Sequence, residues 1–195
     1  MANHLTTRPT HLPKPTYKLV KNMDLVLADL SGSMAGAIKG ATTKYDCLKS
    51  ALAAQGERIG IIGFGYHYDT MESVFETNAL ELPPPSGGTP LTQAFDHALT
   101  LDPMHILVIS DGQPNSKDTA IESAAKLAND VIIDVLYIGP RDDTQATSFM
   151  CHLAEIGRGR YVEYDLVAEG AASPLALTTK VSALLALPAP KTIQL

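Results

Sequence analysis

The chain has 195 residues, of which 45% are hydrophobic, and its formal net charge at pH 7 is −6. This length suits one domain with a substantial core. The negative charge and the lack of a basic cluster argue against nucleic acid as the main partner. No run reaches the roughly 18 apolar residues that a membrane span needs, and the N-terminus lacks the apolar stretch of a signal peptide. We therefore expect a cytoplasmic protein with no membrane partner.

Segments typical of strands and segments typical of helices alternate along the chain. Residues 1–17 contain three prolines and no periodicity, which predicts an extended N-terminal arm before a domain at 18–187. The residues at 188–195 then form a C-terminal tail. Apolar runs predict six strands, at 24–28, 58–64, 73–77, 105–110, 131–138 and 160–164. Apolar residues at helical spacing predict five helices, at 42–55, 90–101, 117–129, 147–156 and 174–187.

Apolar strands separated by helices are typical of a parallel sheet that is covered on both faces. Only the short loop at 65–71 separates the second strand from the third, and this spacing predicts a hairpin. The third strand should therefore be an antiparallel edge. The sequence predicts an α/β fold: a doubly wound, mostly parallel six-stranded sheet with one antiparallel edge strand and helices on both faces.

Polar side chains follow the first predicted strand at alternating positions. Asp29, Ser31 and Ser33 come directly after the apolar run at 25–28, on a turn that leaves a buried strand. One carboxylate and two hydroxyls in this arrangement can face a single point. Such oxygen ligands suit Mg²⁺ or Mn²⁺ rather than zinc. The alternative is a helix N-cap, in which the same side chains accept hydrogen bonds from free amides.

Two later positions have the same character. Thr89 lies in a glycine-rich loop before Pro90, and Asp111 follows the predicted strand at 105–110 and precedes Gly112. Thr89 could instead cap a helix with Pro90 at its first position, and Asp111 could belong to a plain turn. In an open parallel sheet, ligands bind beyond the carboxyl ends of the strands. We therefore expect Asp29 and Asp111 to end neighbouring strands at one edge.

The order of these motifs, D-x-S-x-S followed by a loop threonine and a second aspartate, resembles the von Willebrand factor A domain family. In that family they form the metal-ion-dependent adhesion site. The resemblance covers about 18–187 and implies a Rossmann-like sheet of the kind predicted above. It implies that Mg²⁺ or Mn²⁺ is bound by Asp29, Ser31, Ser33, Thr89 and Asp111. It also implies a protein partner that presents an Asp or Glu to the metal.

We therefore expect an intracellular, metal-dependent protein-interaction module. The resemblance suggests an AAA+ ATPase of the MoxR kind as a partner, or a role in stress or tellurite resistance, in a bacterium or phage. Two alternatives stay open: a metal-dependent hydrolase that uses the same acidic site, and a structural assembly subunit that docks through its arm. We expect no catalysis, because the site motifs contain no suitably spaced histidine, phosphate-binding loop or nucleophile elbow. Cys47 and Cys151 should be buried free thiols.

Overall fold

One six-stranded sheet forms the centre of the computed structural model, which describes residues 19, 21–38, 42–67, 72–170 and 173–186. The predicted arm at 1–17 and tail at 188–195 lie outside these residues. The strands are β1 (Asp24–Asp29), β4 (Gly60–His67), β5 (Glu72–Thr77), β6 (His105–Ser110), β7 (Ile132–Tyr137) and β8 (Arg158–Glu163). Their order across the sheet is β5-β4-β1-β6-β7-β8.

The strand directions confirm the predicted sheet. β1 pairs in parallel with both β4 and β6, and β7 pairs in parallel with β6 and β8. β5 runs antiparallel to β4 and forms one edge, as the short loop between the two strands predicts. The sheet therefore has five parallel strands and one antiparallel edge strand.

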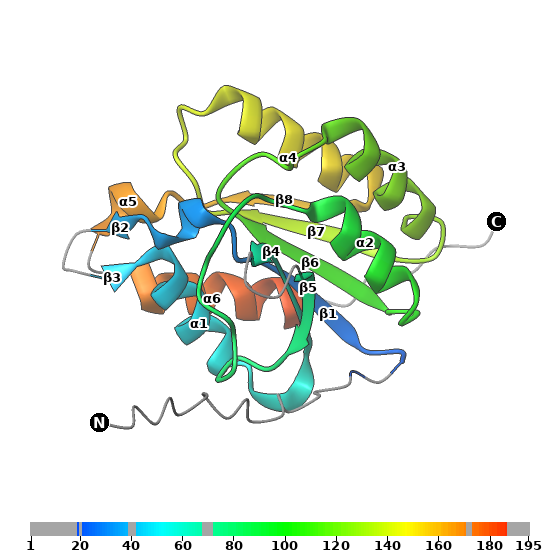
Figure 1. Cartoon of the computed structure of the whole chain (residues 1–195), viewed down its shortest axis with the longest axis horizontal. Coiled ribbons are helices and arrows are strands. Elements are labelled where there is room, and N and C mark those ends of the chain that lie inside the picture. The colour runs from blue at the N-terminus through cyan, green and yellow to red at the C-terminus, as the bar shows by residue number, and fades with distance from the viewer. Residues whose placement is uncertain (1–18, 20, 39–41, 68–71, 171–172, 187–195) are drawn as a thin grey trace, which may run out of the picture.

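Helices cover both faces of the sheet (Figure 1). On one face lie α2 (Leu91–Leu99), α3 (Lys117–Leu127) and α4 (Thr144–Ile156); on the other lie α1 (Lys44–Ala53) and α6 (Ser173–Ala186). Alternate residues of each strand point to opposite faces. Accordingly, Leu25 and Leu27 of β1 belong to the core beneath α2, α3 and α4, whereas Val26 and Ala28 belong to the core beneath α1 and α6.

The bounds of several elements differ from the sequence-based expectation; β4, for example, runs to His67, three residues beyond the predicted strand. A small hairpin, β2 (Ala37–Ile38) with β3 (Thr42–Thr43), precedes α1, so the predicted helix at 42–55 begins later. Thr43 forms a capping box with Asp46, which explains the start of α1 at Lys44. α4 begins three residues earlier than predicted because the Asp143 carboxylate accepts a hydrogen bond from the Ala146 amide at 3.0 Å.

Short helical segments account for the rest of the described elements. The chain forms the 3-10 helices η1 (Gly32–Ala35) and η2 (Gly56–Arg58), and the single-turn helix α5 (Leu166–Glu169). Sequence periodicity does not reveal pieces of this length, because one turn gives no repeat of apolar positions.

A buried ionic network joins three strands to α6. Asp134 of β7 is 1% exposed, and its carboxylate accepts hydrogen bonds from His105 of β6 and Arg160 of β8. The guanidinium of Arg160 also donates to the backbone oxygen of Leu184 at 2.6 Å. Burial alone would raise the pKa of Asp134, but the hydrogen bonds from His105 and Arg160 outweigh it and lower the pKa to about 2.

Two further observations concern the chain as a whole. Both cysteines are free, as expected. Cys47 is buried, which confirms that prediction, whereas Cys151 is only partly buried, so the prediction of a buried side chain is wrong for Cys151. Within the described residues, every helix is too short or too polar to cross a membrane.

Candidate metal-binding site

The predicted site residues lie at the carboxyl edge of the sheet. β1 and β6 are parallel neighbours, so both strands end at this edge, where the blue chain of β1 continues into η1 at the left of Figure 1. Asp29 is the last residue of β1, and Asp111 directly follows the last residue of β6. The chain leaves β1 toward β4 on one side and continues from β6 to β7 on the other. This is the reversal of strand order at which open α/β sheets bind ligands.

Four of the five predicted side chains form one hydrogen-bonded group, which we call the edge cluster: Asp29, Ser31, Ser33 and Asp111. The Ser31 and Ser33 hydroxyl oxygens are 2.9 Å apart. The Ser33 hydroxyl donates to Oδ1 of Asp111 at 2.7 Å, and the Ser31 amide donates to Oδ1 of Asp29 at 2.7 Å. Two chain segments separated by 78 residues therefore meet at this group.

Thr89 lies on a loop that packs against the turn after β1. The Gly32 amide donates to the Gly87 carbonyl oxygen at 2.9 Å. Gly87 has a φ of +64°, and a Cβ atom there would lie 2.4 Å from the carbonyl oxygen of Tyr66, so this position requires glycine. Thr89 itself is 8% exposed, and its amide donates to Oδ1 of Asn115 at 2.8 Å. The structure thus holds Thr89 at the same edge through backbone contacts.

The alternative interpretation of Thr89 as a helix cap is wrong. α2 begins at Leu91, its N-cap position is Pro90, and no side chain caps it. Within the described residues, no hydrogen bond joins the Thr89 hydroxyl to the edge cluster. The Thr89 hydroxyl therefore does not cap α2.

The charge of Asp29 is disfavoured by its surroundings in the edge cluster. Asp29 is fully buried, and burial, followed by the negative charge of Asp111, raises the pKa of Asp29 to about 6. Hydrogen bonds from Ser110 and Ser31 act in the opposite direction but do not offset these effects. A cation bound between the carboxylates would relieve the repulsion.

Sequence analysis missed two residues that contact these carboxylates. The Ser110 hydroxyl donates to Oδ2 of Asp29 at 2.5 Å. The Lys44 ammonium group lies 2.5 Å from Oδ2 of Asp111, and its side chain is only 10% exposed. Ser110 could have been found, because it ends the strand that leads to Asp111. Lys44 could not, because the β2–β3 hairpin separates it from the serine motif.

The donors present here fit a hard divalent cation. The edge cluster offers two carboxylates and two hydroxyls, and Thr89 adds a third hydroxyl at the same edge. Oxygen donors of this kind suit Mg²⁺ and Mn²⁺. In the described part of the chain, no group of three or more His, Cys, Asp or Glu side chains could hold a metal ion. Because the donors of the edge cluster are all oxygen atoms, their chemistry favours Mg²⁺ or Mn²⁺ over zinc.

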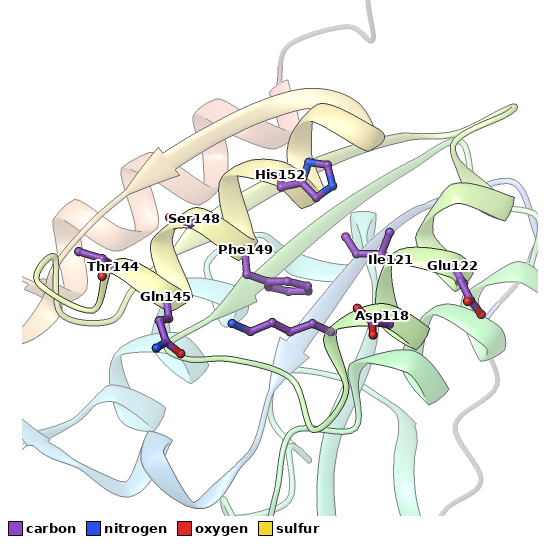
Figure 2. Close-up of a pocket in the computed structure, with 9 residues that line it drawn as sticks. Asp118, Ile121, Glu122, Thr144, Gln145, Ser148, Phe149 and His152 are labelled. Atoms are coloured by element: carbon purple, nitrogen blue, oxygen red, sulfur yellow. The ribbon is translucent and has the colours of Figure 1, made fainter.

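An open groove lies between α3 and α4 (Figure 2). Phe149 of α4 and Ile121 of α3 form its apolar floor, and polar side chains line the rest of it. The residues that line it are Lys117, Asp118, Ile121, Glu122, Thr144, Gln145, Ser148, Phe149 and His152. None of the five predicted site residues is among them.

Comparisons with known proteins agree with the observed fold. The sequence model for the von Willebrand factor type A domain matches residues 25–163. The crystal structure of the SpRpn10 VWA domain is similar, with a TM-score of 0.59 and 15% identity, over 87% of this chain and 100% of that one. A von Willebrand factor type A protein from Catenulispora acidiphila gives a TM-score of 0.54 and 14% identity, over 85% of this chain and 43% of that one.

At these identities, the two structures show a shared fold alone. A comparison with curated proteins gives no match. The matched residues, 25–163, include all five predicted site residues and most of the sheet. Domains of this type are generally protein-interaction modules. The chain therefore belongs to the von Willebrand factor type A domain family.

Proposed function

We propose that this domain is a metal-dependent protein-interaction module. In this proposal, Mg²⁺ or Mn²⁺ is held by Asp29, Ser31, Ser33, Thr89 and Asp111 and receives an Asp or Glu side chain from a partner protein. The observation that carries the proposal is the edge cluster, in which the side chains of Ser31, Ser33 and Asp111 are linked by hydrogen bonds and the Asp29 carboxylate accepts from the Ser31 amide.

The chain holds the two carboxylates in fixed orientations. Asp29 accepts hydrogen bonds from the Ser31 amide on one oxygen and from the Ser110 hydroxyl on the other. Asp111 is held in the same way by Ser33 and Lys44. Such prior orientation lowers the entropy cost of binding, because the side chains do not have to be ordered by the ligand.

The hydroxyl groups supply neutral ligands. Each serine or threonine oxygen has two lone pairs, and its proton can rotate away from a cation. Five ligands that carry only two formal negative charges would leave a divalent cation with net positive charge. A bound Mg²⁺ would therefore supply a positive centre that attracts a partner's carboxylate.

The site is accessible from one side. Ser33 is exposed, whereas Asp29, Ser31 and Asp111 are buried beneath it. Asn115 and Ser116, on the loop that follows Asp111, are exposed as well. A partner would therefore approach past Ser33 and this loop. The partner class to test first is the AAA+ ATPase of the MoxR kind that the family resemblance suggests, followed by proteins of stress or tellurite resistance.

Calorimetric titration with Mg²⁺ tests the metal site. We expect the wild type to bind and the double variant Asp29→Ala, Asp111→Ala to show no binding. A matched control, Glu122→Ala with Asp130→Ala, removes the same charge from exposed positions and should bind like the wild type. If the Asp29, Asp111 double variant bound Mg²⁺ with unchanged affinity, these two carboxylates would not be metal ligands and the proposed site would be wrong.

The interaction itself needs a second experiment. Wild type and the pair Thr89→Ala, Asp111→Ala would serve as bait for proteins of the native host, in Mg²⁺ and in EDTA. We expect a partner that the wild type captures only in Mg²⁺ and that the variant does not capture. Equal recovery by both baits in both buffers would show that the interaction uses another surface.

A further inference from the structure

The Lys44 side chain contacts Asp111 of the edge cluster, and the local backbone fixes the position from which it does so. Lys44 is the first residue of α1, and its backbone is fixed by the capping box of Thr43 and by a hydrogen bond from its amide to the Gly36 carbonyl oxygen at 3.2 Å. A Cβ atom at Gly36 would lie 3.6 Å from Cε of Lys44, so the lysine stem runs directly along this glycine. These backbone contacts therefore place the ammonium group of Lys44 beside Asp111.

The contact is buried and close. Nζ of Lys44 lies 2.5 Å from Oδ2 of Asp111, with 10% of the Lys44 side chain and none of the Asp111 side chain exposed. Lys44 is also the only Lys or Arg that forms an ion pair with an edge-cluster residue in the described part of the chain. Because water is largely excluded, this attraction is screened much less than that of a surface pair.

Without a metal ion, this ammonium group offsets one of the two negative charges of the cluster. A divalent cation held by the same cluster would be repelled by this ammonium group, because both would be attracted to the Asp111 carboxylate. We propose that Lys44 is a built-in competitor of the metal: it stabilises the metal-free domain and lowers its affinity for Mg²⁺. This inference rests on the proposed metal-dependent function and adds control of metal occupancy to it.

Two neutral variants test the inference in the full chain. Lys44→Met keeps the length of the aliphatic stem, and Lys44→Gln keeps a neutral hydrogen-bond donor on a side chain that is one atom shorter. The control Lys126→Met removes the same charge from an exposed position on α3. Mg²⁺ affinity would be measured by calorimetry, and melting temperature by circular dichroism in EDTA and in saturating Mg²⁺.

We expect both Lys44 variants to bind Mg²⁺ at least about tenfold more tightly than the wild type, because a nearby positive charge has been removed. In EDTA they should melt below the wild type, whereas in Mg²⁺ this difference should shrink or reverse. The control should match the wild type in both measurements. Binding by the Lys44 variants alone would also support the inference, and would show that the wild-type site holds Mg²⁺ too weakly for the proposed function.

Other outcomes contradict the inference in distinguishable ways. If the wild type binds Mg²⁺ and the folded Lys44 variants bind with equal or lower affinity, Lys44 does not compete, and the proposed function stands. If neither the wild type nor the variants bind, the inference and the proposed metal site fail together. The inference predicts that Mg²⁺ can replace the positive charge of the missing ammonium group and so stabilise the Lys44 variants. Variants that are unfolded both in Mg²⁺ and in EDTA would therefore also overturn the inference.

Discussion

Replacement of Asp29 by asparagine should make the metal-free domain more stable. Asp29 is fully buried and lies beside a second carboxylate, and its pKa is raised to about 6 from 3.8. At about 1.4 kcal/mol per pKa unit, ionised Asp29 costs the folded state about 3 kcal/mol at pH 7.5. An asparagine avoids this cost, because it is neutral.

Asparagine can also keep the hydrogen bonds of Asp29. Its oxygen can accept from the Ser31 amide, as Oδ1 of Asp29 does at 2.7 Å, and its NH₂ group can donate to the Ser110 oxygen. The Ser110 proton would then turn toward the carbonyl oxygen of Gly112, 3.4 Å away. Because this last bond is long, we expect a net gain of about 2 kcal/mol rather than the full amount.

The pH dependence identifies the cause of this gain. A carboxyl group whose folded pKa is raised stabilises the folded state below its unfolded pKa of 3.8, and this contribution is lost as the pH rises through about 6. The advantage of Asp29→Asn should therefore be full at pH 7.5 and small near pH 4. Urea unfolding in EDTA at both pH values measures it, with the exposed Asp130→Asn as the control. A variant that is less stable than the wild type at pH 7.5, or a gap that ignores pH, would refute this reasoning.

Three further predictions concern the site and the core. Saturating Mg²⁺ should raise the melting temperature of the wild type in a calorimetric scan, because ligand at one hundred times the dissociation constant adds about 2.7 kcal/mol to the free energy of unfolding. Ser33→Ala and Thr89→Ala should keep a folded circular dichroism spectrum while weakening Mg²⁺ binding; an unfolded variant would mean that these hydroxyls are structural. Asp134→Ala should cost about 3 kcal/mol in urea unfolding, because Arg160 and His105 lose their buried partner, and a loss below 1 kcal/mol would show that the network contributes little.

The arrangement of the sheet could be predicted from the sequence because the apolar runs are strong and well separated. The strand at 105–110 was predicted with its observed bounds, and the antiparallel edge followed from one short loop. Placement of Asp29 and Asp111 at one edge needed only the rule that parallel neighbours end together. These inferences rest on local composition and on topology, both of which a single sequence carries.

The contacts that depend on loop geometry could not be predicted. Lys44 reaches Asp111 only because the β2–β3 hairpin turns the chain back over the edge of the sheet, and two-residue strands leave no periodic pattern. The role of Asn115 in holding Thr89 also depends on how two loops meet. Side-chain pairing between distant loops is set by tertiary packing rather than by local propensity.

The site residues are far apart in the sequence, and this spacing determines when the site can form during folding. Ser110 contacts Asp29 across 81 residues, and Lys44 contacts Asp111 across 67. Neither contact can exist until β6 has inserted beside β1 and completed the centre of the sheet. A nascent, truncated or partly unfolded chain would present the serine motif without its second carboxylate. Under the proposed function, a partner would therefore bind only copies of the domain in which β6 has paired with β1.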